Sequence, residues 1–532
     1  MIHFDNCPTV YWLIGYIGAG IVISAAFYKK VPLWLFALSG LALLLFMRLP
    51  AIVLNRELNP DESQMLSYAI TLFQDPVYWR SVDGTTIGPL DNYLLVIPRL
   101  LGFQIDYTSG RIMGLLCAAG TLLCLLYALK NWFGDFTARI SLLVPLLFLA
   151  FTQEVDFVHY SSEQLPVFLL AVILWLLSRF NSESNNASVN SYWLGFAAGA
   201  VPFAKLQAVP QAIVLVFGAF WFCYLIYKQK RTYRPALMLV LGGLTFPVVT
   251  LVWAMYHNVF TDLIDFYLLG NVIYAGGNAK LSIWQQFFKI INLSPDFKVF
   301  TLILIIPIIL SLLLIFKKPQ KNNIPILLIA ISLVLACIYA ITKSGNDFVH
   351  YLNFYIVPWA LLSAIGIKKL NKFAIILPVC LLAWVGFSDA LSYRRHHTLN
   401  QFISDNATTL AQSPVVKELK KYSKKGDYMV VWGWQCTYYV EAQLAQGTAE
   451  NHSERSIFQH NMISTYRSRY MSDIQRTKPA IFIDAVGKNS FWVQNRKTQG
   501  FENYAALAEY ISLHYNFKGT FDDTRLYVRK YH

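Results

Sequence analysis

The sequence contains few charged residues, and acidic residues are especially scarce. Only 14% of the 532 residues are charged, whereas soluble domains contain about a quarter. Asp and Glu number 30 against 44 Lys and Arg, and hydrophobic residues make up 56% of the chain. This balance excludes an ordinary soluble protein and indicates a polytopic α-helical membrane protein.

Cysteine is also scarce, and cleavable or repetitive segments are missing. The seven cysteines are scattered, and only Cys7 and Cys436 lie clearly outside apolar runs. Their spacing matches neither a metal site nor a disulfide framework, so we predict no metal-binding residues. The first apolar run lacks the basic start and the small-residue cleavage site of a signal peptide, so we expect a retained helix. There is no internal repeat and no low-complexity segment.

About twelve apolar runs are long enough, or nearly so, to cross a membrane. They lie at roughly 10–28, 33–54, 108–128, 139–155, 164–180, 191–206, 208–227, 235–256, 298–316, 324–342, 350–367 and 373–391. Basic residues occupy every second loop: Lys29/Lys30, Lys130/Arg139, Arg179, Lys228/Lys230/Arg231/Arg234, Lys317/Lys318/Lys321 and Lys368/Lys369/Lys372. The positive-inside rule places these loops in the cytoplasm and the other loops, with both termini, outside. The net charge of +14 therefore reflects topology, and we expect no nucleic-acid partner.

The composition divides the chain into a membrane part, 1–391, and a soluble part, 392–532. Two long outer loops, about 55–107 and 257–297, carry aromatic-rich amphipathic stretches suited to the membrane interface. In the tail, KELKKYSKK is typical of a helix, whereas DYMVVWGW, PAIFID and TRLYVRK are typical of strands. We therefore predict a small extracytoplasmic α/β domain at 392–532.

The stretch Asn59-Pro60-Asp61-Glu62 opens the first outer loop. Asn59 favours the N-cap of a helix, Pro60 the first helical position, and Glu62 completes a capping box. Asp61 is not needed for that box, so it either complements the helix dipole or carries chemistry. Its outward position beside aromatic residues favours chemistry. Adjacent residues point about 100° apart on a helix, so the two carboxylates cannot form a facing acid–base pair.

Two isolated basic residues lie at the predicted outer edge of the membrane. Lys205, in GAVPFAKLQAVP, ends a run that goes outward, and Arg111 begins the next run after the first outer loop. A lysine here either snorkels to the interface or faces a cavity, where it suits a phosphate. The positive-inside bias makes an outer lysine unexpected, which favours phosphate binding.

Two further outer segments combine hydrogen-bond donors and acceptors. VDFVHYSSEQLP holds Asp156, His159, Tyr160 and Glu163, which form either a polar turn between helices or a grip for sugar hydroxyls. TKSGNDFVHYLNFYIVP holds Lys343, His350 and Tyr351, a set suited to a lipid phosphate or a sugar.

The stretches NPDESQMLSYAITLFQDPVYWR, DGTTIGPLDNYLL, PRLLG and GRIMGLL resemble the type C glycosyltransferase superfamily. The likeness is to the bacterial branch related to the aminoarabinose–lipid A transferase and the protein O-mannosyltransferases. It is good over roughly 55–130 and diffuse over the rest of the membrane part, where FAKLQAVP and HYLNFYIVP resemble later family segments. The tail, with GDYMVVWGW and PAIFID, resembles the soluble outer domain of many members. One departure is Gly88-Pro89, where the aminoarabinose branch has a basic residue before the proline, so lipid A is not supported as the acceptor.

The resemblance implies a multi-pass enzyme of the bacterial inner membrane that uses a polyprenyl-phosphate sugar at the periplasmic face. The family's acidic base maps onto Asp61, with Glu62 as its partner, and its phosphate-binding lysine onto Lys205. Departure of a sugar phosphate needs positive charge, supplied by Lys205, by Arg111 or by a divalent cation if one binds. One carboxylate suffices to deprotonate the acceptor hydroxyl of a glycan, lipid or protein, and the lack of a facing nucleophile predicts inversion.

Two other classes of membrane protein remain as alternatives. A transporter or flippase for lipid-linked sugars would show inverted repeats and charged, interrupted helices at the membrane midplane, and neither is clear here. A polysaccharide polymerase or ligase of another multispan fold would depend on arginines and a histidine in a large late loop rather than on an acidic first loop.

Overall fold

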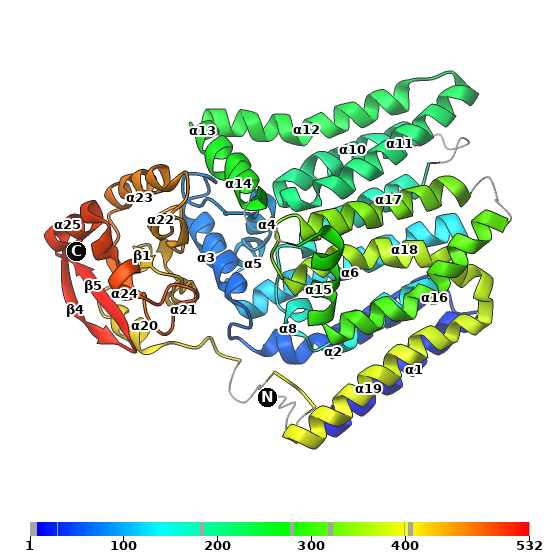
Figure 1. The fold of residues 1–532 in the computed structure, drawn as a ribbon, viewed down its shortest axis with the longest axis horizontal. Coiled ribbons are helices and arrows are strands. Elements are labelled where there is room, and N and C mark those ends of the chain that lie inside the picture. The colour runs from blue at the N-terminus through cyan, green and yellow to red at the C-terminus, as the bar shows by residue number, and fades with distance from the viewer. Residues whose placement is uncertain are drawn as a thin grey trace. The chain divides into compact units, whose positions relative to one another are not determined.

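The computed structural model describes residues 8–28, 30–180, 186–276, 281–317, 323–397, 399–402 and 408–530. Cys7, Lys29, Lys318 and Lys321 lie outside these residues. Helices dominate the described chain, and the only sheet within it is formed by the C-terminal domain, residues 408–530. The polytopic helical fold with a small α/β domain at the C-terminus is thus confirmed (Figure 1).

The chain forms two compact units. The helical unit comprises 1–53, 114–252 and 272–405, and the mixed unit comprises 54–113, 253–271 and 406–532. This division differs from the boundary that composition suggests near residue 391. Composition marks where the chain stops being apolar, but side-chain packing joins the loop after the second helix to the C-terminal domain.

Each of the twelve predicted runs coincides with a helix. Their bounds are α1 (Pro8–Phe27), α2 (Leu33–Val53), α6 (Tyr107–Phe133), α7 (Asp135–Phe151), α9 (Gln164–Ser178), α10 (Ala187–Ala204), α11 (Val209–Lys230), α12 (Arg234–Tyr256), α16 (Pro295–Lys317), α17 (Asn323–Thr342), α18 (Asn353–Leu370) and α19 (Ile376–His396). Eight described segments are long and apolar enough to cross a membrane by length and composition. The number twelve therefore stays a prediction.

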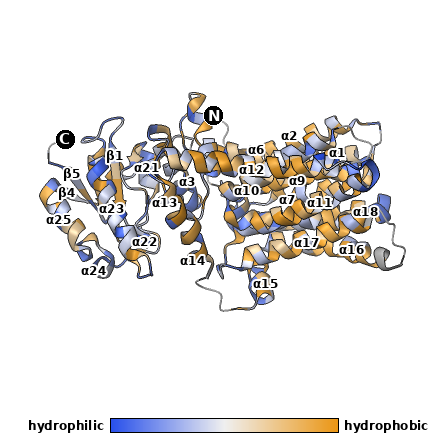
Figure 2. Cartoon of the chain, turned by 90° about the horizontal axis from the view of Figure 1, so that it is seen from above, coloured by the Kyte–Doolittle hydropathy of each residue, from blue (hydrophilic) through white to orange (hydrophobic). Residues whose placement is uncertain are grey.

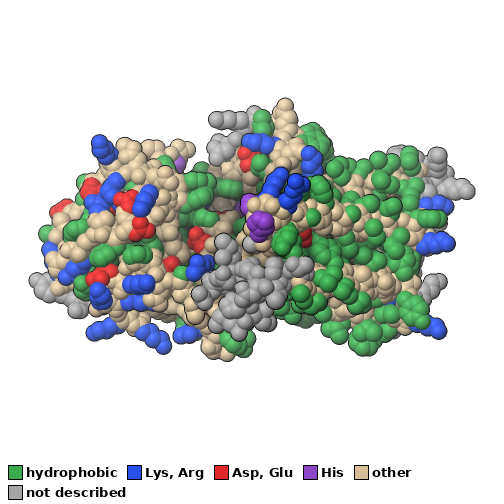
Figure 3. All heavy atoms as spheres, turned by 90° about the horizontal axis from the view of Figure 1, so that it is seen from below, with side chains coloured by type: hydrophobic (Ala, Val, Ile, Leu, Met, Phe, Trp, Pro, Cys, Tyr) green, Lys and Arg blue, Asp and Glu red, His purple; other side chains and the backbone are tan. Residues whose placement is uncertain are grey.

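The core of the helical unit is built around α7 and α18. Every α7 residue from Thr137 to Phe151 is buried, because α7 is apolar around its circumference and other helices cover it. The first and last of the predicted spans, α1 and α19, lie side by side, and the Tyr16 hydroxyl donates a 2.6 Å hydrogen bond to Asp389 (Figure 1). Hydrophobic residues colour most of these helices in Figure 2, and the face of this unit seen in Figure 3 is largely apolar, as expected for contact with lipid.

Short helices connect the long ones. They are α4 (Pro89–Leu94), α5 (Ile97–Leu100), α8 (Val155–Val158), η1 (Leu206–Ala208), α13 (Phe260–Asp262), the π-helix η2 (Leu263–Leu269), α14 (Gly270–Gly276), α15 (Ile283–Leu293), η3 (Val349–Leu352) and η4 (Asn371–Ile375). The expected amphipathic helix in SIWQQFFKIINL is α15, which Ser282 and Gln285 start with a capping box. The stretch PLDNYLLVIPRLLG forms two short helices, α4 and α5, because Pro98 sits in the first turn of the second.

The mixed unit contains α3 (Pro60–Gln74) and the C-terminal domain. The helices of that domain are α20 (Pro414–Leu419), α21 (Thr437–Ala442), α22 (Glu454–Ile457), α23 (Ile463–Thr477), α24 (Arg496–Gln499), η5 (Phe501–Asn503) and α25 (Ala505–His514). Its strands are β1 (Tyr428–Trp432), β2 (Ala445–Gln446), β3 (Ile481–Asp484), β4 (Tyr515–Phe521) and β5 (Thr524–Arg529). The three predicted strands correspond to β1, β3 and β5, whereas β2 and β4 were not predicted, and the helix expected in KELKKYSKK begins earlier and ends at Leu419.

The five strands form one sheet in the order β2-β1-β3-β5-β4. Strand β1 pairs in parallel with β2 on one side and with β3 on the other, with Trp432 opposite Asp484. Strand β5 pairs antiparallel with β3 and β4. The central strands β1 and β3 are almost wholly buried, so their residues form the core of the domain.

Candidate active site

The acidic segment predicted to carry chemistry forms the first turn of α3. Asn59 is the N-cap, with extended backbone, and its side-chain oxygen accepts a 2.9 Å hydrogen bond from the Asp61 amide. Pro60 occupies the first helical position, as predicted. Asp61 follows it and is partly exposed. The cap thus fixes the backbone from which the Asp61 carboxylate projects.

Glu62 and Arg111 form a buried bidentate ion pair. Arg111 Nε donates to Glu62 Oε1 at 2.8 Å and Nη2 donates to Oε2 at 2.7 Å, with 0% of Glu62 and 2% of Arg111 exposed. Arg111 also donates to the carbonyls of Leu54 and Arg56, at 2.5 and 2.6 Å. A guanidinium with this many partners holds the segment before α3 against the start of α6. Its role toward a phosphate stays a prediction.

Glu62 also supports the helix start, but in a different way from the capping box expected. Its Oε2 accepts a 3.0 Å hydrogen bond from the amide of Leu58, the residue before the N-cap. Glu62 thereby connects the segment before the N-cap to the first turn of α3.

Glu57 is a third carboxylate at this place, and sequence reasoning missed it. Its side chain accepts a hydrogen bond from the Ser63 hydroxyl. Burial raises the pKa of Glu57 to about 7, the bond from Ser63 opposes this rise, and the nearby carboxylates of Glu62 and Asp61 add to it. The signal was present in the sequence, since Glu57 stands four residues before Asp61 in RELNPDE.

The C-terminal domain holds α3 through polar contacts along its length. The Tyr107 hydroxyl is 2.7 Å from Ser63 Oγ and 2.8 Å from Thr437 Oγ1, and it joins the first turn of α3 to the start of α21. Asn451 Nδ2 donates to the Gln64 carbonyl at 2.8 Å and to Ser67 Oγ at 2.6 Å. Helix α3, which carries Asp61, therefore packs as part of the same unit as the C-terminal domain.

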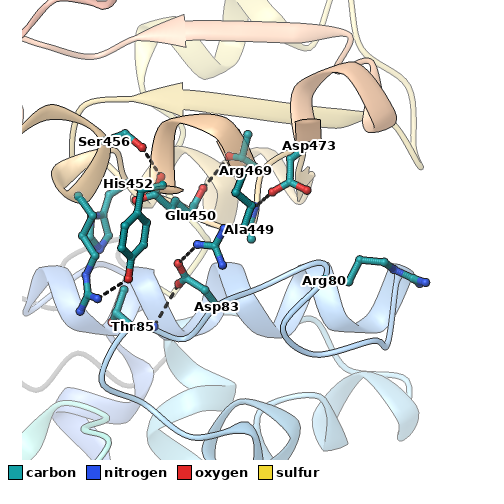
Figure 4. Close-up of polar contacts among 12 residues, drawn as sticks. Arg80, Asp83, Thr85, Ala449, Glu450, His452, Ser456, Arg469 and Asp473 are labelled. Atoms are coloured by element: carbon teal, nitrogen blue, oxygen red, sulfur yellow. Dashed lines mark hydrogen bonds and ion pairs between the residues drawn. The ribbon is translucent and has the colours of Figure 1, made fainter. Parts of the chain in front are cut away.

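A second buried ion pair connects the loop after α3 to α23. Asp83 Oδ2 accepts from Arg469 Nη2 at 2.5 Å, with only 1% of Asp83 exposed, and Figure 4 shows the two side chains pointing toward each other. Close by, burial raises the pKa of Glu450 to about 8, and the Asp83 carboxylate adds to this rise. The Asp473 carboxylate accepts from the Ala449 amide at 2.9 Å and fixes the segment between β2 and α22 (Figure 4).

In the helical unit, Lys205 lies in a buried polar cluster with several of the predicted residues. It caps the C-terminus of α10 with extended backbone and is 4% exposed. Its ammonium donates to Ser162 Oγ at 2.6 Å and to the carboxylate of Glu163, which is 0% exposed. The same ammonium lies 5.3 Å from the centre of the Tyr351 ring. The lysine does not snorkel outward, and its charge is compensated by a carboxylate predicted to bind sugar.

Two histidines extend this cluster. His350 Nδ1 donates to Asp156 Oδ1 at 3.1 Å, and its ring meets that of His159 edge to face at 5.9 Å between centroids. His159 Nδ1 donates to the Val155 carbonyl at 2.7 Å, which leaves Nε2 without a hydrogen-bond partner among the described residues. One oxygen of the Glu163 carboxylate is likewise buried without a partner within the same described ranges. A buried polar atom without a hydrogen-bond partner costs folding free energy, and a bound ligand would supply that partner.

The remaining predicted residues take different positions. Tyr351 is buried and its hydroxyl lies 3.1 Å from that of Tyr274, which sequence reasoning did not single out. Tyr160 is buried between α8 and α9, and Lys343 follows α17 and is exposed. Within the described residues, no three His, Cys, Asp or Glu side chains are arranged to hold a metal ion.

No protein-family model matches the sequence, and no curated protein matches it. Two solved structures of ArnT from Cupriavidus metallidurans are similar, one bound to undecaprenyl phosphate (TM-score 0.58, 12% identity) and one in the apo state (TM-score 0.56, 11% identity). Each match covers 92% of this chain and 97% of that chain. ArnT is a type C glycosyltransferase, and the likeness runs through both the helical part and the C-terminal domain. The chain therefore has the type C glycosyltransferase fold.

Proposed function

We propose that this protein is a membrane glycosyltransferase that moves a sugar from a polyprenyl-phosphate donor to an acceptor hydroxyl at the periplasmic face of the bacterial inner membrane. The observation that carries the proposal is the fold shared with ArnT over 92% of the chain, since ArnT was solved with undecaprenyl phosphate bound. The acidic turn, which carries Asp61 and Glu62, and the buried cluster around Lys205 supply the carboxylate and the positive charge that this chemistry needs.

Asp61 serves as the general base. The acceptor hydroxyl gives its proton to the Asp61 carboxylate as its oxygen forms a bond to the anomeric carbon of the donor. The bond between that carbon and the phosphate oxygen breaks, and its electrons leave with the polyprenyl phosphate. Attack from the face opposite the phosphate inverts the configuration of the anomeric carbon. Asn59, Glu62 and Arg111 fix the turn from which Asp61 acts.

The Lys205 cluster binds the donor phosphate. Departure of the phosphate builds negative charge, which a buried ammonium stabilises more strongly than an exposed one would. His350 and Tyr351 lie beside Lys205, and His159 adds a ring nitrogen without a partner among the described residues. Binding requires Lys205 to exchange its contact with Glu163 for the phosphate, so Glu163 acts as a competing anion that occupies the site between reactions. Lys343, which is exposed, is the weakest member of the predicted phosphate set.

Asp61→Asn tests this function directly. Purified protein would be given undecaprenyl phosphate carrying a ¹⁴C-labelled hexose or pentose, together with a cell-envelope extract as the source of acceptor. We expect product formation to fall about a hundredfold to ten-thousandfold, since a positioned base contributes that much. Asp75→Asn, which removes a carboxylate from the C-cap of the same helix, is the matched control and is expected to change the rate little.

Normal transfer by Asp61→Asn would refute the assigned base. Movement of the lipid-linked sugar across vesicle membranes without any glycosyl product would instead favour a flippase.

A further inference from the structure

The topology of the C-terminal sheet creates a place where ligands commonly bind. The chain leaves β1, forms β2 on one side of it and then crosses to form β3 on the other side. The segments that follow β1 and β3 therefore leave the sheet at the same edge, the one formed by the carboxyl ends of these strands, and run in opposite directions. Such a switch point opens a crevice outside the carboxyl ends of parallel strands. The segment after β2 returns to this edge too, because the Ser453 amide donates to the Gly433 carbonyl at 3.0 Å.

Four aromatic rings gather at this edge, which we call the aromatic edge: Trp434, His452, Phe491 and Trp492. The Trp434 and His452 rings stack at 4.0 Å with 5° between their planes. Phe491 and Trp492 stack at 4.7 Å and meet Trp434 edge to face at 5.2 and 5.3 Å. Trp434 is 7% exposed, whereas Phe491 is 36% and Trp492 51% exposed. The outer half of the cluster thus offers a ring surface to solvent.

The backbone is arranged to hold these rings in place. Trp434 N donates to Ser490 Oγ at 2.8 Å, and Phe491 N donates to the Trp434 carbonyl at 2.9 Å. Gly433 has a φ of 111°, and an added Cβ would lie 3.1 Å from the backbone of the segment after β3. Trp492 has a φ of 61°, a conformation that is rare for a large side chain and costs free energy. Strain that exposes an indole instead of burying it is typical of a functional position.

The aromatic edge also contains two buried hydrogen-bond donors that have no partner among the described residues. His452 Nε2 lies 3.1 Å from Gln64 Nε2, and since the amide nitrogen can only donate, the ring proton of His452 resides on Nδ1. That nitrogen and the indole Nε1 of Trp434 are both buried and have no hydrogen-bond partner within the part of the chain that the structure describes. Because both N–H groups are buried, the surface that is open to a ligand is formed by the rings of Phe491 and Trp492.

The aromatic edge is continuous with the helix that carries the proposed base. Gln64, which contacts His452, is three residues after Asp61 on α3. Cys436 lies two residues after Trp434, and the carboxylates of Glu57 and Asp61 add to burial in raising its pKa, so these carboxylates are close to the same segment.

We propose that the aromatic edge binds a saccharide, namely the sugar portion of the acceptor, and that the exposed ring of Trp492, backed by Phe491, stacks on the sugar ring while the buried Trp434 and His452 support the two outer rings. This assignment rests on the proposed function for the identity of the acceptor. A pyranose ring has an apolar C–H face, which an exposed indole ring complements. Lys488 and Gln494, which are close to Phe491 and Trp492 in the sequence, are exposed and polar, which favours a polar ligand over an apolar helix.

The test is saccharide binding by the full-length protein. The protein would be reconstituted in phospholipid nanodiscs, because maltoside and glucoside detergents carry competing sugars, and applied to a printed array of bacterial envelope oligosaccharides. We expect wild type to bind at least one saccharide and Trp492→Ala to bind it about tenfold or more weakly, with Trp492→Phe intermediate because it keeps a ring. Phe517→Ala is the matched control, since Phe517 is 55% exposed on β4 of the same sheet, and should bind as wild type does.

The possible outcomes separate this site from the catalytic proposal. No saccharide bound by wild type, equal binding by Trp492→Ala, or equal signal on spots that carry only the linker would each overturn the saccharide site. Asp61→Asn should bind the array as wild type does, because it leaves the aromatic edge intact. Normal transfer by Asp61→Asn together with weakened binding by Trp492→Ala would refute the base while supporting the saccharide site.

Discussion

The acidic turn of the mixed unit and the lysine cluster of the helical unit each contain a buried ion pair, but the two pairs differ in how completely they are satisfied. Glu62 and Arg111 share two hydrogen bonds, and both side chains make further bonds to backbone groups. Lys205 and Glu163 share one contact, and a Glu163 oxygen and a nitrogen of neighbouring His159 have no partner among the described residues.

This difference indicates different roles. A buried ion pair whose donors and acceptors are all hydrogen-bonded stabilises one conformation and resists exchange of partners. A buried pair with spare hydrogen-bonding capacity tolerates a new ligand, because an incoming phosphate gains bonds that the protein alone does not make. We therefore propose that the Glu62–Arg111 pair holds Asp61 in place and that the Lys205 cluster binds the donor phosphate.

Removal of the Glu62 charge should produce the largest effect on stability. Glu62→Gln leaves Arg111 buried with its charge uncompensated, which costs about 3–5 kcal/mol of folding free energy. Thermal unfolding of the purified protein, followed by tryptophan fluorescence, measures this loss. Asp75→Asn is the control, since it breaks the more exposed pair with Arg80 and should cost about 1 kcal/mol or less.

The same variant distinguishes the two roles of Arg111. If Arg111 bound the donor phosphate, Glu62→Gln would release the guanidinium and tighten the binding of undecaprenyl phosphate. We expect no such gain in affinity. Tighter binding by Glu62→Gln would contradict the proposal that Arg111 has a structural role and does not bind phosphate.

Lys205→Gln should weaken the binding of undecaprenyl phosphate about tenfold to a hundredfold, because it removes the charge that faces the phosphate. Glu163→Gln should bind as tightly as wild type or more tightly, because it removes the competing anion. Titration of the lipid phosphate by microscale thermophoresis measures both. Lys289→Gln, which changes a half-exposed lysine of the same unit, is the control. Unchanged affinity in Lys205→Gln would reduce the cluster to a structural ion pair.

Sequence patterns predicted the elements well because their signals are local. Hydrophobic runs located every long helix of the helical unit, and the order Asn-Pro at 59–60 located the start of α3. Of the C-terminal strands, β1 and β3, which are almost wholly buried, were found, and so was β5, in which buried and half-buried residues alternate. Strand β4 was missed because most of its residues are exposed and Gly519 interrupts its pairing, and β2 has only two residues.

Which side chains pair with each other in the two sites could not be predicted, because the paired residues are far apart in the chain. Arg111 and Glu62 are separated by 49 positions, Lys205 and Glu163 by 42, and His350 and Asp156 by 194. Sequence reasoning therefore proposed Arg111 and Glu163 as ligand-binding groups, whereas the structure shows each paired with a residue of opposite charge. The contact of Gln64 with His452, across 388 positions, has no local signal at all.

The smallest expected effect is a pH dependence of the mixed unit that originates at His452. Burial lowers the pKa of His452 to about 3, with Asp83 opposing and Arg455 reinforcing the shift. The unfolded chain has a normal imidazole with a pKa near 6.5, so the folded state binds fewer protons than the unfolded state between these two values. The stabilisation is therefore complete above pH 6.5 and is lost as the pH falls toward 3, at about 2 kcal/mol between pH 7.5 and pH 5.

His452→Gln removes this titration while keeping an acceptor for Gln64, so thermal unfolding of the variant should show a smaller loss of stability from pH 7.5 to pH 5 than wild type, by about 2 kcal/mol. His514→Gln, which replaces an exposed imidazole of the same unit, should leave the pH difference unchanged. Equal pH sensitivity in wild type and His452→Gln would mean that the ring is protonated as easily in the folded protein as in the unfolded chain. In that case its stacking on Trp434 and its contact with Gln64 would not isolate it from water, and the aromatic edge would be more open than its geometry indicates.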